Sequence, residues 1–363
     1  MTAVPADEIP EPDRLPGAPH PRQADRVLGQ DGAVAEFLAA AAQGRLHHGW
    51  LLSGPRGTGK ATLGWAMARW LLAGGRPGDI GPDPASPVLR RMRALSEPRL
   101  HLVRRPFDER AGRLRTEITV DEIRRLQGFF HLSAAEGGRR VAIIDAADEM
   151  NSAAANALLK QLEEPPRDAT LILIAHQPAR LLPTIRSRCR ELRLHPLAPD
   201  ALKEILSGLG ITGDAARLAA LADGSAGEAV RLAAQDGLAT YQRIVALFEG
   251  FPGMDRVAMQ ALADAAGGRP QGGADPFELA VTLLERFLSR AARAGLLGPP
   301  LPEAAEGEAA LLARLSPDAR AARHWADALA RLSARARQGR AVNLDPSALV
   351  MDMLVALASE PVA

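Results

Sequence analysis

Residues 54–62, GPRGTGKAT, have the spacing of a phosphate-binding loop. Gly54, Gly59 and Lys60 match the pattern of a glycine, four residues and then Gly-Lys. In such a loop the glycines let backbone N–H groups point at phosphate oxygens, while the lysine reaches the terminal phosphates. We therefore predict a nucleotide site, with Gly57 as a further lining residue. The alternative is an ordinary glycine-rich turn that contains a lysine.

The position after the lysine departs from this pattern. Ala61 stands where a serine or threonine coordinates Mg²⁺ in active hydrolases, and it has no oxygen to offer. Thr62 is one residue late and needs a local shift of the chain to take over that role. Two interpretations stay open: the loop binds nucleotide weakly, with Thr62 among its contacts, or it is a remnant of a nucleotide site.

A second residue of the nucleotide site is predicted at Asp145, directly after the apolar run 141–144. A carboxylate at the end of a buried strand steers the metal in phosphate-loop proteins, and helix capping is its alternative role. The next residue is Ala146, whereas hydrolases with an Asp-Glu pair use the glutamate to polarise the attacking water. The second catalytic group is therefore missing too. Asp148 and Glu149 are expected to be surface charges.

Alternating strand and helix patterns surround these positions over about residues 25–195, which predicts an α/β fold with a parallel sheet flanked by helices. The phosphate loop connects an apolar run to a helix with apolar residues at helical spacing. A capping box at Thr119 and Glu122 and an N-cap at Asn151 predict two further helices. The expected strands are 50–52, 100–103, 141–144, 171–175 and 191–194.

Strand patterns disappear after Pro196, and the rest of the chain is predicted to be helical. The last helix is expected to begin at Asp345, with Pro346 in its first turn. Glycines and prolines at 267–276 predict a loop. The predicted division is a loose tail at 1–20, an α/β P-loop module at 21–195, a small helical domain at 196–236 and a helical domain at 237–363.

The 363 residues are 47% hydrophobic and 24% charged, the balance of a globular protein. A net charge of +1 argues against nucleic-acid binding through bulk charge alone. Arginines nevertheless cluster between residues 90 and 115, and they are either a solvated face or a DNA surface. The single cysteine, Cys189, excludes a disulfide framework and predicts the reducing cytoplasm. No apolar run has the length of a membrane span, so no membrane partner is expected.

Three separated motifs resemble one known family. They are RRVAIIDAADEMN at 139–151, SAAANALLKQLEEPP at 152–166 and LLPTIRSRC at 181–189. Their order and spacing are similar to the AAA+ modules of bacterial clamp loaders, most closely the delta-prime type of DNA polymerase III subunit. The likeness is dense over the α/β module and loose beyond it, where NLDPSALVMDML at 343–354 is similar. The resemblance implies an AAA+ P-loop module, a small helical lid domain and an all-α collar domain.

The same resemblance implies that Arg188, in the Ser-Arg-Cys stretch, is an arginine finger that reaches the ATP of a neighbouring subunit. A planar, permanently charged guanidinium stabilises the negative charge that builds on the transferred phosphoryl group. From charge pattern alone, Arg186, Arg188 and Arg190 would be interpreted as solvated surface arginines. The flanking Ser187 and Cys189 favour the finger, and Cys189 itself is expected to be a buried apolar side chain.

Two features of the family are missing. Clamp-loader ATPases have a sensor arginine shortly after a Gly-Ser pair, and Gly227 occupies its place in GSAGEAV. Many relatives hold a four-cysteine zinc module after the phosphate-loop helix, but residues 71–98 contain no cysteine, so no zinc is expected. Together with Ala61 and Ala146, Gly227 predicts a nucleotide site without its hydrolytic groups.

The resemblance thus implies a clamp-loader subunit that is itself neither polymerase nor active ATPase, although the holoenzyme is a DNA-directed DNA polymerase. Its expected partners are the gamma/tau ATPase subunits, the delta subunit and the sliding clamp, with primed DNA in the assembled hetero-oligomer. ATP is the only expected cofactor, without hydrolysis at this site. Two alternatives stay open: an active gamma/tau-like motor that uses Thr62 in place of the missing hydroxyl, and a DNA-binding module that works through the arginine clusters.

Overall fold

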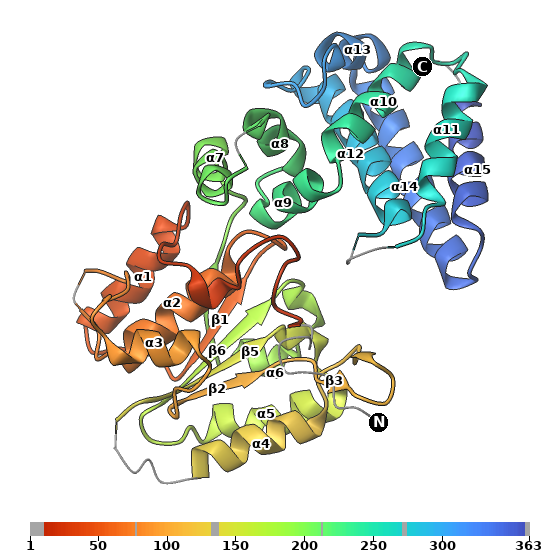
Figure 1. Cartoon of the computed structure of the whole chain (residues 1–363). Helices are drawn as coiled ribbons and strands as arrows, with labels where there is room; N and C mark the ends of the chain where they lie inside the picture. Colours follow the sequence, from red (N-terminus) through yellow and green to blue (C-terminus); the bar gives the residue numbers. More distant parts are fainter. Residues whose placement is uncertain (1–10, 77, 132–137, 212, 271–273, 360–363) are drawn as a thin grey trace. The chain divides into compact units, whose positions relative to one another are not determined.

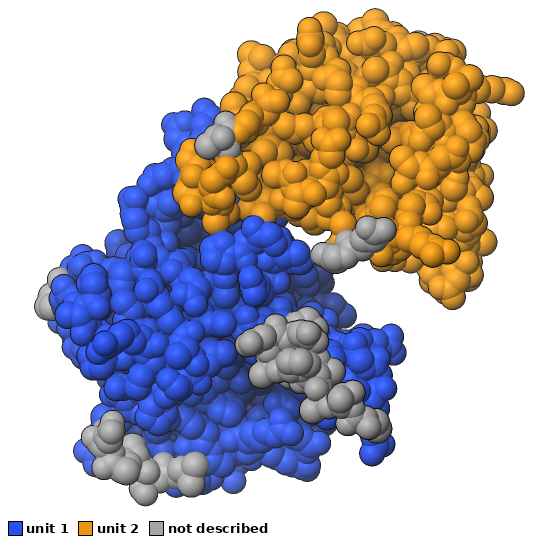
Figure 2. All heavy atoms as spheres, viewed as in Figure 1, with its two compact units in different colours: residues 1–205, 225–227 blue, residues 206–224, 228–363 orange. Residues whose placement is uncertain are grey.

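The computed structural model describes residues 11–76, 78–131, 138–211, 213–270 and 274–359. Residues 1–10 of the expected tail and 271–273 of the expected loop lie outside them. The chain forms two compact units, residues 1–205 with 225–227 and residues 206–224 with 228–363 (Figure 2). We name them unit 1 and unit 2 and describe each by itself.

A five-stranded parallel sheet forms the centre of unit 1. Its strands are β1 (Gly49–Ser53), β2 (Leu100–Val103), β5 (Arg140–Asp145), β6 (Ala169–Ala175) and β7 (Arg190–Arg193). Their order is β2-β5-β6-β1-β7, and every neighbouring pair is parallel. Every residue of β1 and β6 is buried, as in parallel sheets that are covered on both faces. The predicted α/β fold and its five strands are confirmed.

Two layers of helices cover the faces of this sheet (Figure 1). They are α1 (Asp31–Ala42), α2 (Lys60–Leu72) and α3 (Pro87–Arg93) in one layer, and α4 (Val120–His131) and α5 (Ser152–Glu163) in the other. Side chains alternate along β1, so Trp50 and Leu52 pack with the first layer and Leu51 with the second. Asn151 caps α5 by accepting a hydrogen bond from the Ala154 N–H (2.9 Å), as predicted.

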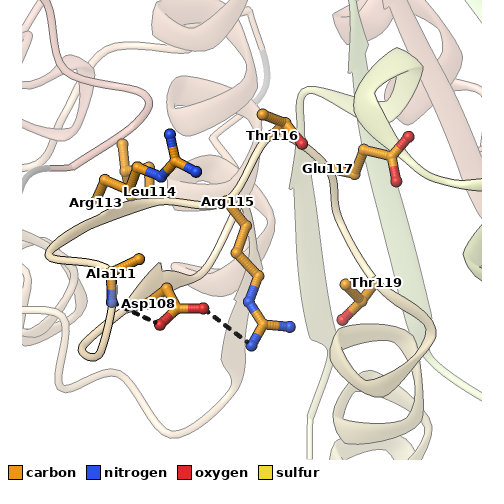
Figure 3. A pocket seen from close by; sticks show the side chains of 8 residues that line it. All are labelled: Asp108, Ala111, Arg113, Leu114, Arg115, Thr116, Glu117 and Thr119. Atoms are coloured by element: carbon orange, nitrogen blue, oxygen red, sulfur yellow. Dashed lines mark hydrogen bonds and ion pairs between the residues drawn. The ribbon is translucent and has the colours of Figure 1, made fainter.

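Between β2 and α4 lies a short antiparallel hairpin that the sequence pattern did not predict. Its strands are β3 (Phe107–Asp108) and β4 (Arg113–Leu114), too short for a periodic pattern. Residues of the hairpin and of the segment leading into α4 line a hollow of about 290 Å³ (Figure 3). Asp108 lies within it and pairs with Arg115 at 3.4 Å. The other short elements of unit 1 are η2 (Pro21–Gln23), η3 (Ala147–Glu149), η4 (Pro178–Arg180) and α6 (Pro183–Arg186).

The arginines between residues 90 and 115 lie among carboxylates of unit 1. Four of their ion pairs are Arg91–Glu97 (2.8 Å), Arg93–Asp25 (2.5 Å), Arg105–Glu149 (2.8 Å) and Arg115–Asp108 (3.4 Å). A guanidinium that is already paired with a carboxylate contributes less to phosphate attraction than a free one. These pairs favour an ion-paired protein surface over a dedicated DNA surface.

Residues 11–20 differ from the loose tail that the sequence predicted over 1–20. His20 is only 3% exposed, and the side chain of Asp13 is 1% exposed. The sequence pattern did not reveal this because the segment is rich in proline and acidic residues and has no apolar periodicity. Ion pairs and hydrogen bonds to other parts of unit 1 hold the segment instead.

Unit 2 is built of helices, as the loss of strand patterns after Pro196 predicted. They are α8 (Ala215–Ala222), α10 (Gly237–Glu249), α11 (Arg256–Ala266), α12 (Pro276–Leu297), α13 (Glu308–Leu315), α14 (Ala319–Ala341) and α15 (Pro346–Ala358), while α7 (Pro199–Gly208) and α9 (Ala226–Ala234) each span the division between the units. Asp345 caps α15 by accepting from the Ala348 N–H (2.8 Å), which confirms the predicted start of the last helix. Among the described residues, no helix has the length and apolar character needed to cross a bilayer.

A buried carboxylate joins three helices of unit 2. Glu308, at the start of α13, is 0% exposed. It accepts hydrogen bonds from the Tyr241 hydroxyl (2.5 Å), from Arg290 Nε (2.5 Å) and Nη2 (2.9 Å), and from the Ala304 N–H (2.7 Å). Burial and the charge of Glu308 raise the pKa of Tyr241 well above its ordinary value, so its hydroxyl stays a donor. This cluster cross-links α10, α12 and α13.

Candidate nucleotide site and arginine finger

The phosphate loop lies between the end of β1 and the start of α2, where the sequence predicts it. Gly54, Gly57 and Gly59 have φ angles of 139°, 75° and 91°, in the region that favours glycine. Space excludes a side chain on Gly54 as well, because its Cβ would lie 2.4 Å from the carbonyl oxygen of Leu194. The three glycines therefore form the kind of turn that a phosphate cradle requires.

Lys60, the first residue of α2, is buried beneath this turn. Its Nζ donates to the Gly54 carbonyl at 2.7 Å and also to the Pro55 carbonyl. Burial lowers the pKa of Lys60 to about 8, against the opposing charges of Asp145 and Asp148. The lysine thus lies near both carboxyl groups, but its ammonium group binds the loop itself.

Asp145 ends β5 and is 8% exposed. Burial, followed by the charges of Asp13 and Glu149, raises its pKa to about 7, although Lys60 lowers it. An ordinary aspartate is fully ionised at neutral pH, whereas this one is about half protonated. Without a metal cation nearby, burial thus favours the neutral form of Asp145.

Replacement of Asp145 by asparagine is expected to flatten the pH dependence of stability. A carboxyl whose pKa is raised on folding favours the folded state at low pH, and this stability is lost as the pH rises from the unfolded value near 4 through about 7. Asp145→Asn removes that loss, so the free energy of unfolding should gain on the order of 2 kcal/mol relative to wild type between pH 5 and pH 8. Urea denaturation of both proteins at the two pH values measures this difference. An identical pH dependence in both would contradict it.

The three altered positions, Ala61, Ala146 and Gly227, hold residues without polar side chains. The methyl group of Ala61 packs on the core beneath α2, and Ala146 is 4% exposed. Gly227 lies on the phosphate loop, since a Cβ there would be 3.2 Å from Gly57 Cα. The Ala226 N–H also donates to the Gly57 carbonyl at 2.9 Å. The loop geometry therefore fits phosphates, but position 61 offers the metal no ligand.

His176 and Asp148 are residues of this site that the sequence analysis did not identify. The Asp148 carboxylate, expected to be a surface charge, accepts the N–H groups of His176 (3.0 Å) and Gln177 (2.9 Å) and so fixes the end of β6. The His176 Nδ1 is buried without a hydrogen-bond partner among the described residues. Burial, Lys60 and Arg56 lower the pKa of His176 to about 4, so its ring is neutral at pH 7.

The sheet brings most of the predicted site residues together. The phosphate loop, His176 and Arg104 follow β1, β6 and β2, and Asp145 ends β5; these four strands are consecutive neighbours in the sheet. Because the strands are parallel, all four lie along one carboxyl-terminal edge. Thr62 is in the first turn of α2, beside the loop.

Arg188 lies elsewhere, on the segment between α6 and β7. Arg190, which begins β7, is in register with Trp50 near the start of β1, so Arg188 lies at the amino-terminal edge of the sheet. Its side chain is 36% exposed, pairs with Glu163 at 2.9 Å and donates to the Thr184 carbonyl at 3.0 Å. The guanidinium therefore lies at the surface, on the edge opposite its own phosphate loop.

The neighbours of Arg188 have different roles. Arg190 pairs with Glu36 at 2.9 Å and lies over the ring of Trp50, 5.2 Å from its centroid. Burial raises the pKa of the Cys189 thiol to about 12, so the thiolate is not formed at neutral pH. Cys189 also packs against the core beneath α5, as a small apolar side chain.

A five-stranded parallel sheet with a glycine-rich phosphate loop after β1 and a carboxyl group at the end of β5 defines a P-loop module. The family model described as DNA polymerase III, delta subunit, matches residues 29–198. Over this region the chain is similar to bacterial DNA polymerase III delta-prime subunits.

Individual relatives show similarity over parts of the chain. A delta-prime subunit of Bacillus subtilis is 36% identical over 208 residues, 56% of this chain and 60% of that protein. One from Pseudomonas aeruginosa is 42% identical over 142 residues, 39% of this chain and 41% of that protein. A gamma/tau subunit of Mycobacterium tuberculosis is 28% identical over 284 residues, 72% of this chain and 48% of that protein. The match thus spans 60% or less of the length of each of these relatives.

Proposed function

We propose that this protein is the delta-prime-type subunit of a bacterial clamp loader, that it does not hydrolyse ATP, and that it supplies Arg188 to the ATP of a neighbouring subunit. In the assembled complex with gamma/tau and delta subunits it helps to load the sliding clamp onto primed DNA. The similarity to delta-prime subunits supports membership in the polymerase III assembly, and the role of Arg188 is the finer part of the proposal.

One asymmetry supports this role most directly. Arg188 is at the surface on the edge of the sheet opposite its own phosphate loop, which supports a role at another subunit's nucleotide. Its own site has no metal ligand at Ala61, and burial raises the pKa of Asp145 to about 7. The protein thus has an exposed cationic side chain at Arg188, whereas its own nucleotide site lacks a metal ligand at position 61.

ATP turnover by the isolated protein tests the proposal. We expect none above background, either alone or mixed with partner subunits whose own phosphate-loop lysines are replaced. The relatives named gamma/tau, at 28% identity, favour a second candidate, an active motor that uses Thr62 as the metal ligand. Turnover by the isolated chain that is abolished by Thr62→Ala would establish this motor instead.

Magnesium is expected to add little to nucleotide affinity, because position 61 has no hydroxyl. Removal of Mg²⁺ should change the Kd of wild type for ATP by less than about threefold, whereas Ala61→Ser should make Mg²⁺ strengthen binding by about tenfold. Calorimetric titration with and without EDTA measures both values. Thr62→Ala is the matched control and should behave as wild type. A strong Mg²⁺ dependence in wild type that Thr62→Ala removes would contradict the expectation.

A further inference from the structure

The segment before η2 is attached to the same edge of the sheet as the phosphate loop. Arg104 directly follows β2, and its Nη1 contacts Asp13 Oδ1 at 2.8 Å and Glu11 Oε1 at 3.3 Å. The same Glu11 oxygen is also bound by Arg22 Nη1 at 2.6 Å. Residues 11–20 therefore lie against the carboxyl-terminal edge, where the red chain passes near the ends of the strands in Figure 1.

A second attachment is to α2, the helix that begins with Lys60. The His20 ring packs edge-on against Trp65 of this helix, with 5.5 Å between centroids. His20 Nδ1 accepts the Arg22 N–H at 3.0 Å, so in the neutral ring the proton is on Nε2, which donates to Asp13 Oδ2 at 2.9 Å. Both oxygens of Asp13 are thus bound, one by Arg104 and one by His20.

Asp13 lies beside the carboxyl group of the nucleotide site. In the sheet, Val103 is in register with Ile144, so Arg104 and Asp145 are the next residues on adjacent strands. Asp13 is bound to Arg104, and among the neighbouring charges it makes the largest contribution to the raised pKa of Asp145. Two residues on, Leu15 Cδ2 lies 4.0 Å from the position of a Cβ on Gly227, the residue that covers Gly57. The segment therefore extends from the end of β2 to the phosphate loop.

This arrangement opposes a bound polyphosphate. The negative charges of a nucleoside triphosphate would lie next to Asp13, whose repulsion in a buried site is only weakly screened. Arg104 is the cation at the end of β2, and its guanidinium is already paired with Asp13 and Glu11. Displacement of the segment would remove both carboxylates and free one guanidinium at the same edge.

We propose that residues 11–20 are a built-in competitor for nucleotide, in which Asp13, held by Arg104 and His20, keeps polyphosphates out of the phosphate loop. The loop is then a latent site for a nucleoside triphosphate that opens when the segment is released. This inference concerns the chain's own nucleotide site and is independent of Arg188, whose role is measured on a neighbour's ATP.

The test measures the affinity of the full chain for ATP with a fluorescent ATP analogue and competition by ATP. Asp13→Asn removes the charge but keeps the size of the side chain, and we expect it to bind ATP at least about tenfold more tightly than wild type. Asp25→Asn is the matched control, because Asp25 pairs with Arg93 at the surface and should leave affinity unchanged. Circular dichroism verifies that each variant is folded.

Trypsin cleavage after Arg14, an exposed residue of the segment, reports its release independently. Asp13→Asn should accelerate this cleavage together with the gain in affinity. A folded Asp13→Asn variant with wild-type ATP affinity overturns the proposal, whether or not cleavage is faster. Should Asp13→Asn fail to fold, Glu11→Gln loosens the outer pairs with Arg22 and Arg104 and is expected to gain affinity about threefold. Wild-type affinity in that variant together with accelerated cleavage also overturns the proposal.

Discussion

Arg188→Ala is expected to lower ATP turnover by on the order of a thousandfold at the neighbouring site that Arg188 faces in the reconstituted complex. The guanidinium would stabilise charge on the transferred phosphoryl group, and alanine leaves nothing in its place. Assembly should persist, because Arg188 makes one surface ion pair, with the half-exposed Glu163, and such pairs contribute about 0–1 kcal/mol. Single-turnover hydrolysis with the complex in excess over ATP separates the affected site from the others.

Two variants make this measurement specific. Arg186→Ala removes an exposed arginine two residues away and should leave turnover unchanged. Arg188→Lys keeps a positive charge without the planar fork and should recover only part of the rate. The finger assignment would be withdrawn if Arg188→Ala hydrolysed ATP at the wild-type rate in a complex shown to be fully assembled.

Glu308→Ala is expected to destabilise unit 2 by about 3–5 kcal/mol, because it leaves the mostly buried Arg290 charge without a carboxylate partner. The carboxylate accepts four hydrogen bonds from α10, α12 and the chain before α13, so its loss also leaves the Tyr241 hydroxyl and the Ala304 N–H without their acceptor. Hydrogen exchange read by mass spectrometry on α12 and α13 measures the local free energy of opening and keeps unit 1 out of the comparison.

Surface substitution next to this cluster provides the control. Glu306→Gln changes an exposed side chain two residues earlier and should shift the opening free energy by no more than about 0.5 kcal/mol. Tyr241→Phe removes one neutral donor and should cost about 1 kcal/mol. A loss of less than about 1 kcal/mol for Glu308→Ala would show that Arg290 finds another partner or water when the carboxylate is removed.

The sequence by itself determined the α/β unit and the location of its phosphate loop. Periodic burial is a local property, so the runs that became β1, β5 and β6 could be recognised one at a time, and their parallel pairing followed from the helices between them. The loop glycines were predictable for the same reason, because positive φ is required residue by residue. The caps at Asn151 and Asp345 also depend on three or four consecutive residues.

Only the tertiary structure decided which charges meet. Asp13 and Arg104 are 91 residues apart, and Tyr241 and Glu308 are 67 apart, so no spacing in the chain indicates either contact. The placement of Arg188 on the edge opposite the phosphate loop depends on β7 pairing beside β1, which is a property of the whole sheet. Burial and ionisation of Asp145 likewise arise from groups on separate segments, because electrostatic energy depends on distance in space and on exclusion of water, not on order along the chain.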